Sequence, residues 1–210
     1  MKSIALRPWE LAAYMRWKNG GHKGPFLLVR PVKSRWDNRW EVDDCGPNGA
    51  MWPYWPDYVH GGEMDDPRMP CPFGKPGEVL GIKEPFEIAP ERHEPDNHTW
   101  LTYLADVHRE EIDGSEIDMG RLELGRKYGA RSLPLWAVRH RPTIADIRVM
   151  TLKEITSAMS REAGCEGGHG TNGTMYSADP YEHFRYRWKK DHGEKSWAAN
   201  PWCWFMNVVE

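Results

Sequence analysis

Residues 196–206 have the sequence SWAANPWCWFM, an aromatic run interrupted by a proline close to the end of the chain. Trp202 and Trp204 lie on the same face of an extended chain, so residues 202–209 are predicted to form a buried β-strand. Pro201 cannot donate a ladder hydrogen bond, which suits the first residue of that strand. So apolar a strand at an open edge would promote aggregation, and we therefore expect it inside a sheet or a closed barrel.

The composition limits the ways in which the chain can bind a partner. A chain of 210 residues suits one domain with elaborations. Its formal net charge of -3 excludes non-specific binding of duplex DNA driven by the overall charge of the protein. Any nucleic-acid binding must therefore depend on a local basic patch and on stacking, for which the 12 tryptophans offer candidates when they are not part of the core.

The sequence gives no sign of a metal centre or of a membrane anchor. Cys45, Cys71, Cys165 and Cys203 form no CxxC pair and have no ligand-like spacing with histidine, so we expect no structural zinc and no other cofactor. The N-terminus lacks the apolar region of a signal peptide, and no membrane span or lipidation motif is visible. We therefore expect a cytoplasmic protein with free thiols and no membrane partner.

Hydrophobic periodicity predicts short strands interspersed with short helices. The predicted helices cover residues 4–18, 151–163 and 180–190, and the second of them begins with Thr151 and Glu154 at the spacing of a capping box. Residues 109–127 are expected to form a solvated helix or loop. The predicted strands cover residues 26–30, 79–83, 100–106, 136–138, 143–150 and 202–209. This order favours a compact α+β fold built on a small mixed β-barrel.

Four stretches of the chain carry a resemblance to a known family. They are CPFGKPGEVLGIKE at 71–84, PLWAVR at 134–139, IRVMTLKEI at 147–155, and GEKSW followed by NPWCW within 193–204. In this order and spacing they resemble phage and prophage proteins of the ASCH group, within the PUA-like superfamily. The resemblance covers most of residues 1–33 and 70–210. It implies a single domain over residues 1–210 with a partly open barrel, flanking short helices and a cleft that binds RNA, single-stranded DNA or a modified nucleoside.

The resemblance also raises an enzymatic alternative, since some small bacterial ASCH proteins are metal-free amidohydrolases that deacylate N4-acetylcytidine. The GxK of the ASCH signature is similar to residues 21–23, and Arg30 is similar to its arginine. Those enzymes carry a threonine directly after the lysine, where this chain has Gly24. Their late helix glutamate aligns with Ala163, next to Glu162.

Lys23 and Glu162 are therefore the candidate catalytic pair. A lysine buried in a cleft loses pKa and can act as a base or nucleophile, although it can equally hold a phosphate as a cation. Glu162 could serve as general acid or base if it comes within hydrogen-bond reach of the scissile amide. Whether the chain is an enzyme stays open at this point.

Further candidate binding residues lie in and around two predicted strands. Lys83 and Glu84 are adjacent and point to opposite faces of a strand, so one of them is expected to face the cleft. Arg139, with His140 and Arg141, forms the best local candidate for a phosphate contact. Trp136 completes this set, although a solvated strand end would have the same composition.

Residues 34–70 are predicted to be an insertion rather than a plain loop. Trp36, Trp40, Trp52 and Trp55 occur there among prolines, glycines and aspartates, and the stretch is long enough to hold short strands of its own. Exposed aromatic side chains are typical anchors of protein interfaces. A third possibility is therefore a phage protein that binds a host protein through this insertion, in the host cytoplasm.

Overall fold

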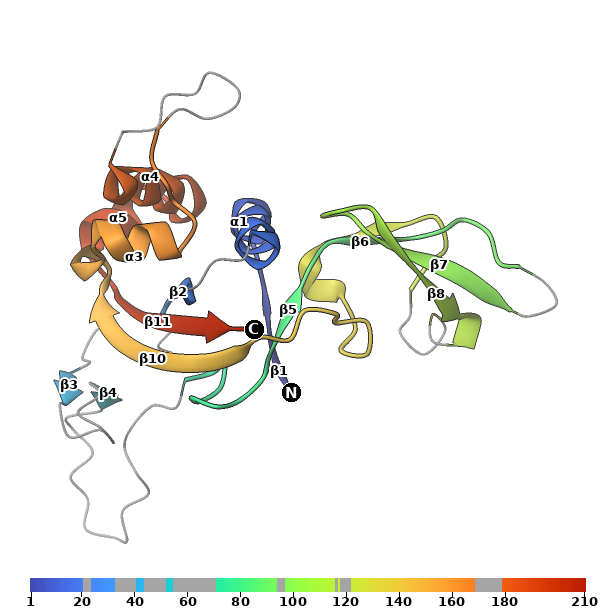
Figure 1. Ribbon diagram of the computed structural model, residues 1–210, viewed down its shortest axis with the longest axis horizontal. Helices are drawn as coiled ribbons and strands as arrows, with labels where there is room; N and C mark the ends of the chain where they lie inside the picture. Colours follow the sequence, from blue (N-terminus) through green and yellow to red (C-terminus); the bar gives the residue numbers. More distant parts are fainter. Residues whose placement is uncertain are drawn as a thin grey trace, which may run out of the picture. The chain divides into compact units, whose positions relative to one another are not determined.

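The computed structural model describes residues 1–20, 24–32, 41–43, 52–54, 71–93, 97–115, 117, 122–168 and 179–210. The chain combines short helices with several mostly antiparallel sheets (Figure 1), which confirms the predicted α+β class. Its contacts form two compact units, unit 1 from Met1–Arg16 and Val79–Pro142 and unit 2 from Trp17–Glu78 and Thr143–Glu210. The single domain expected from the resemblance stays a prediction.

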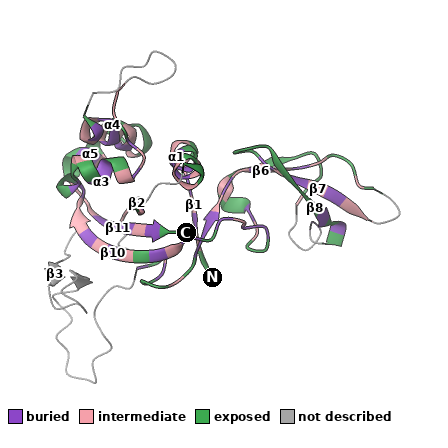
Figure 2. Cartoon of the chain, viewed as in Figure 1, coloured by how far each residue is buried: buried purple, intermediate pink, exposed green. Residues whose placement is uncertain are grey.

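The C-terminal strand is the centre of the main sheet of unit 2. Strand β11 (Trp202–Val209) lies between β10 (Thr143–Thr151) and β2 (Phe26–Pro31), and it is antiparallel to both. Figure 2 shows that most of β11 is buried, and Trp204 is only 1% exposed. The predicted strands at 26–30, 143–150 and 202–209 are thus confirmed, with the last inside a sheet, as expected.

Three helices of unit 2 lie together beside this sheet (Figure 1). They are α3 (Ser157–Glu162), α4 (Pro180–His192) and α5 (Glu194–Ala199). Pro180 lies in the first turn of α4, where a missing N–H costs nothing. Asp179 caps α4 and also accepts a hydrogen bond of 2.7 Å from the Ser157 hydroxyl of α3. The helix predicted at 180–190 is confirmed.

The prediction of one continuous helix over residues 151–163 is wrong. Thr151 and Glu154 do form the predicted capping box, but it opens only the short 3-10 helix η3 (Leu152–Glu154). Thr156 then has extended backbone angles and starts α3 anew, because its side chain accepts a hydrogen bond from the Met159 N–H. Two consecutive caps therefore divide one apolar pattern into two short helices.

The predicted insertion is described only in part. Strands β3 (Glu41–Asp43) and β4 (Trp52–Tyr54) pair antiparallel within it, which agrees with the short strands expected there. The other residues of the 34–70 stretch lie outside the described part of the chain, and with them most of its tryptophans. A host-protein interface in this stretch stays a prediction.

Unit 1 begins with a strand that the sequence pattern does not reveal. Residues Lys2–Ala5 form β1, which pairs in parallel with β5 (Leu80–Lys83). Helix α1 (Pro8–Asn19) begins only after this strand, so the helix predicted at 4–18 starts too early. The short apolar segment at the N-terminus forms a strand because it pairs with β5, which is far away in the sequence. Such long-range pairing leaves no local sequence signal.

The larger sheet of unit 1 has the strand order β8-β7-β6-β9. Its strands are β6 (Phe86–Ile88), β7 (His98–Tyr103), β8 (His108–Asp113) and β9 (Lys127–Tyr128). Strand β7 corresponds to the strand predicted at 100–106, whereas β8 contradicts the solvated helix or loop predicted from residue 109. Only Ile112 of β8 is buried, so this edge strand has the composition of a solvated segment.

The strand predicted at 136–138 is wrong, because these residues form a turn. The apolar pattern has another cause. Leu133, Ala137 and Val138 are buried in the core cluster under the larger sheet, while Leu135 and Trp136 are exposed. We refer to residues 130–142 as the 130–142 segment, which includes the 3-10 helix η2 (Ala130–Ser132).

The described strands form four separate sheets of two, three, two and four strands, and no closed barrel is present among them. The α+β class thus holds without the closed sheet that the strand pattern favoured. Among the described residues, no helix is both long enough and apolar enough to cross a bilayer.

Candidate functional site

The 130–142 segment carries the most exposed tryptophan for which exposure is described. Trp136 is 40% exposed and its neighbour Leu135 is 49% exposed. The turn that presents them is closed by the Val138 N–H, which donates to the Leu135 carbonyl at 3.3 Å. A large aromatic face at a closed turn, directly before a buried stretch, is a feature suited to contact with a partner.

The residues after this turn are held to the rest of unit 1 by several hydrogen bonds. The Tyr103 hydroxyl, at the end of β7, lies 2.6 Å from the Ala137 carbonyl oxygen. The Ile82 N–H donates to the His140 carbonyl, and the Leu80 N–H donates to the Pro142 carbonyl, both at 2.9 Å. The backbone that follows Trp136 is therefore held by side-chain and main-chain hydrogen bonds.

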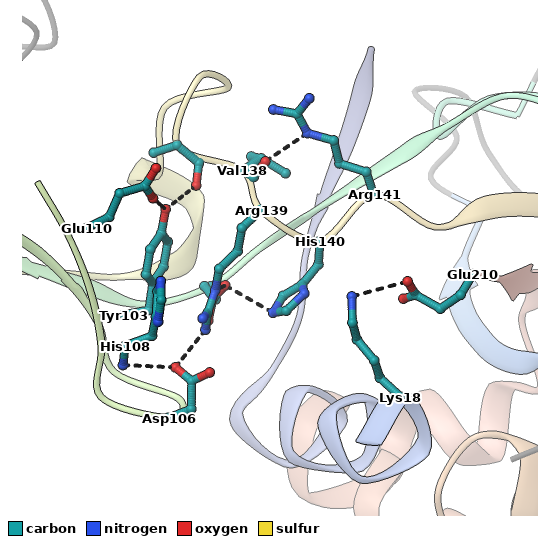
Figure 3. Close-up of polar contacts among 12 residues, drawn as sticks. Lys18, Tyr103, Asp106, His108, Glu110, Val138, Arg139, His140, Arg141 and Glu210 are labelled. Atoms are coloured by element: carbon teal, nitrogen blue, oxygen red, sulfur yellow. Dashed lines mark hydrogen bonds and ion pairs between the residues drawn. The ribbon is translucent and has the colours of Figure 1, made fainter. Parts of the chain in front are cut away.

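Arg139 makes the central side-chain contact of this region (Figure 3). Its Nε and Nη2 donate to the two carboxylate oxygens of Glu84 at 2.7 and 2.8 Å, and Nη2 also donates to Asp106 Oδ1 at 2.7 Å. The guanidinium carbon lies 4.2 Å from the centre of the Tyr103 ring. Arg139 is thus a planar link between the end of β5, the β7–β8 turn and the 130–142 segment.

The charges around Arg139 argue against its expected role as a phosphate contact. One guanidinium faces two carboxylates, so the group of three carries a net charge of −1 when ionised. Burial opposes the charge of Arg139, but the hydrogen bonds and charges of Glu84 and Asp106 outweigh it and raise the pKa of Arg139. A phosphate at this place would have to displace a carboxylate, so we assign Arg139 a structural role.

His140 extends the same cluster into the core. Its Nε2 lies 3.5 Å from Glu84 Oε1, and both side chains are buried. The His140 ring meets the Tyr14 ring of α1 edge-on, with 5.7 Å between ring centres. His140 is therefore a core residue and does not form a basic surface together with Arg139 and Arg141.

Three other cations of unit 1 have no acidic partner among the residues that the structure describes. The Lys83 ammonium donates only to the Arg131 carbonyl at 3.4 Å, and Arg141 Nε donates to the Val138 carbonyl at 2.9 Å. No ion pair involves the exposed Arg131 side chain within that part of the chain. Figure 3 shows that the Arg141 side chain points away from Arg139. Within the described residues, no carboxylate neutralises these positive charges.

The sequence around these cations strengthens this picture. No aspartate or glutamate occurs between Glu123 and Asp146, whereas that interval contains Arg126, Lys127, Arg131, Arg139 and Arg141. Arg126 pairs with Glu123, and Lys127 with Glu87, so these two are neutralised locally. The remaining positive charge lies on Arg131 and Arg141, which precede and follow Trp136 by five residues in the sequence, and on Lys83, which bonds to the Arg131 carbonyl.

The described residues do not test the candidate catalytic pair. Lys23 lies outside them. Glu162 is the last residue of α3 and is half-buried. Arg30 is half-buried on β2, opposite Trp204 of β11, and its Nη1 donates to the Val29 carbonyl at 2.8 Å. Arg30 and Glu162 belong to unit 2, and amidohydrolysis by Lys23 and Glu162 stays a prediction.

The sequence analysis missed Tyr103 and Asp106, the partners that decide the role of Arg139. Asp106 lies in the β7–β8 turn, where its Oδ1 also accepts a hydrogen bond of 3.1 Å from the His108 N–H. Val107, next to it, has a φ of 58°, which is unusual for a β-branched residue. The only available signal was the placement of an aspartate in a predicted strand end, which is too common to be informative.

A search of the described residues for three or more His, Cys, Asp or Glu side chains that could share a metal ion finds no such group. No protein-family model matches the chain. No curated protein and no solved structure matches it either. Function is therefore inferred from the side chains of the 130–142 segment and of β5.

Proposed function

We propose that unit 1 binds single-stranded nucleic acid, RNA or DNA, through Trp136 and the cations Lys83, Arg131 and Arg141. The observation that carries this proposal is an exposed tryptophan with an arginine five residues before it and another five residues after it, both without an acidic partner among the described residues. Stacking on an aromatic ring stabilises an unpaired base by about 1–3 kcal/mol and requires no particular sequence. The cations supply contacts to the phosphates on either side of the stacked base.

A single strand fits this surface better than a duplex. Bases inside a duplex are stacked on one another, so an exposed tryptophan can reach only a base that is splayed out. The net charge of -3 also removes the long-range attraction on which non-specific duplex binding depends. Arg139 is left out of the phosphate contacts, because Glu84 and Asp106 already neutralise it.

We also propose that the chain is an ASCH protein of the PUA-like superfamily that acts in the cytoplasm. Support comes from three of the four motif stretches, each of which includes part or all of a strand: 71–84 contains β5, 147–155 contains the second half of β10, and 193–204 contains α5 and the start of β11. The fourth, 134–139, contains Trp136 and Arg139. The family's ligands, RNA, single-stranded DNA or a modified nucleoside, agree with a site that stacks a base.

The proposal is tested by fluorescence anisotropy with a labelled single-stranded RNA of about 12 nucleotides, a length suited to one small binding surface. Trp136→Ala is expected to weaken binding roughly 5- to 150-fold, the equivalent of about 1–3 kcal/mol of lost stacking. Leu135→Ala is the matched control, because it truncates the exposed neighbour but removes no aromatic face.

Single-stranded DNA, the corresponding duplex and the free nucleosides are titrated in parallel. Binding of the single strands, weak binding of the duplex and a selective loss in Trp136→Ala support the proposal. Equal affinities of Trp136→Ala and Leu135→Ala, or no binding of any single strand at low salt, would refute it. Binding of a nucleoside alone would identify a small-molecule site instead.

A further inference from the structure

Tyr103 is buried at the end of β7, and its hydroxyl lies between two acceptors. The Ala137 carbonyl oxygen is 2.6 Å away and Glu110 Oε2 is 2.8 Å away. Ala137 directly follows Trp136 in the chain, whereas Glu110 lies on the exposed edge strand β8. One hydroxyl thus connects the proposed stacking residue to a surface carboxylate.

The two contacts cannot both be made by the phenol proton. A carbonyl oxygen and an ionised carboxylate only accept hydrogen bonds, and the tyrosine hydroxyl has a single proton to donate. Burial, followed by the hydrogen bond and charge of Glu110, raises the pKa of Tyr103, so the phenol keeps this proton. Glu110 in its ionised form therefore competes with the Ala137 carbonyl for it.

Among the side-chain hydrogen bonds of the described residues, the one from Tyr103 to Ala137 lies nearest to Trp136 in the sequence. The Arg141 side chain at the Val138 carbonyl, the Arg139 side chain and the main-chain bonds at His140 and Pro142 hold the later part of the segment. Between Trp136 and these anchors, the Tyr103 hydroxyl alone among the described side chains bonds to the backbone of Ala137. A movement of the turn that displaces Ala137 would therefore stretch or break this bond.

We propose that Tyr103 is a positioning residue for the Trp136 side chain, and that Glu110 weakens its hold on the turn. The inference rests on the proposed function of Trp136. A tryptophan whose backbone is fixed loses less conformational entropy when a base stacks on it, so a stronger Tyr103–Ala137 bond favours binding. Tyr103 thus fixes the backbone at Trp136 more firmly and Glu110 fixes it less firmly, and neither side chain contacts the nucleic acid.

Two substitutions change this bond in opposite directions. Tyr103→Phe removes the hydroxyl but keeps the buried ring. Glu110→Gln supplies an amide N–H that donates to the phenol oxygen, which leaves the phenol proton entirely to the Ala137 carbonyl. If Tyr103→Phe destabilises the protein too strongly to be studied, Glu110→Gln still gives a result of defined sign.

The first readout is hydrogen exchange of the Val138 amide, which closes the turn by donating to Leu135. Relative to the wild type, exchange is expected to be roughly three- to tenfold faster in Tyr103→Phe, as for one lost hydrogen bond, and slower in Glu110→Gln. Amides of the unit 2 strands serve as internal controls and should not change. Unchanged Val138 exchange in both variants overturns the inference.

The second readout is a double-mutant cycle for binding of single-stranded RNA. Tyr103→Phe is expected to weaken binding roughly three- to tenfold in the wild type and to have no further effect in Trp136→Ala, because the two residues act through one contact. Equal losses in both backgrounds overturn the positioning role and leave the proposed function standing. No RNA binding by the wild type overturns the proposed function, while the exchange rates still decide whether Tyr103 holds the turn.

Discussion

Glu84 and Arg139 meet along two parallel hydrogen bonds of 2.7 and 2.8 Å, with the Glu84 side chain fully buried and the Arg139 side chain 19% exposed. Such a pair is not in itself strong evidence of stability, because both charges lose hydration on burial. Removing one residue of the pair strongly destabilises the protein, because the other charge then stays buried without a partner of opposite charge. The pair therefore ties the end of β5 to the 130–142 segment.

Removing one member of this pair tests its structural role. Glu84→Ala is expected to lower the free energy of unfolding by about 3–5 kcal/mol, because Arg139 would keep only the partly exposed Asp106 as a partner. Urea denaturation followed by circular dichroism measures the change. Glu123→Ala is the matched control, since its ion pair with Arg126 is exposed and therefore weakened by solvent screening. Similar losses in the two variants would contradict the structural role of Glu84.

The stability of unit 1 should depend on pH through Asp106. Burial raises the pKa of this carboxyl, but the hydrogen bonds from Arg139 and His108 and their charges outweigh it, so the pKa lies below the ordinary value of 3.8. A depressed pKa in the folded state contributes stability above the unfolded pKa, and this is lost as pH falls through the folded pKa.

The Asp106→Asn variant isolates this contribution. The difference in unfolding free energy between the wild type and this variant should be largest near neutral pH and should shrink as the pH falls below about 4. Denaturant titrations at a series of pH values give the difference. A constant difference down to about pH 2 would show that the ionised form of Asp106 is not the one stabilised by folding.

The two tryptophans of β11 should differ in their contribution to stability. Trp204→Ala is expected to cost about 3–5 kcal/mol, because the side chain is 1% exposed in the central strand. Trp202→Ala should cost clearly less, since Trp202 is half-buried at the start of the strand. Thermal and urea unfolding of both variants measure the difference. An equal or larger loss for Trp202→Ala would conflict with the burial of β11.

The salt dependence of RNA binding should report the proposed phosphate contacts. For single strands, the slope of log K against log salt is about −0.7 for each neutralised phosphate, so Arg141→Ala should make the slope shallower by about that amount. Lys127→Ala removes the same charge from a residue that already pairs with Glu87, and it should leave the slope unchanged. Equal effects on the slope would indicate a general charge effect rather than a defined contact.

Strands and helices with complete local patterns were predictable from the sequence. Strand β11 alternates large apolar residues after a proline, and α4 begins with Asp179 and Pro180, so both follow from short-range rules. Strand β1 was missed because it is specified by its parallel partner β5, and β8 because only Ile112 among its residues is buried. Long-range pairing and edge strands leave little trace in a single sequence.

The sequence allowed the residues of the candidate site to be named, but it did not allow their roles to be predicted. Five of the expected residues, Lys83, Glu84, Trp136, Arg139 and Arg141, occur in unit 1 on β5, directly after it, or on the 130–142 segment. A basic run was interpreted as a phosphate contact, but Arg139 faces two carboxylates and His140 lies in the core. Asp106 reaches Arg139 through the fold of the β7–β8 hairpin, which no local pattern specifies.

Photo-crosslinking tests the central claim, that a base stacks on Trp136, most directly. A single-stranded RNA containing bromouridine is irradiated with the protein, because this base crosslinks to aromatic side chains against which it stacks, and tryptic peptides are then identified by mass spectrometry. The account predicts a crosslink within residues 132–139, at Trp136, that is lost in Trp136→Ala and kept in Leu135→Ala. A crosslink confined to other peptides, or one that persists in Trp136→Ala, would contradict it.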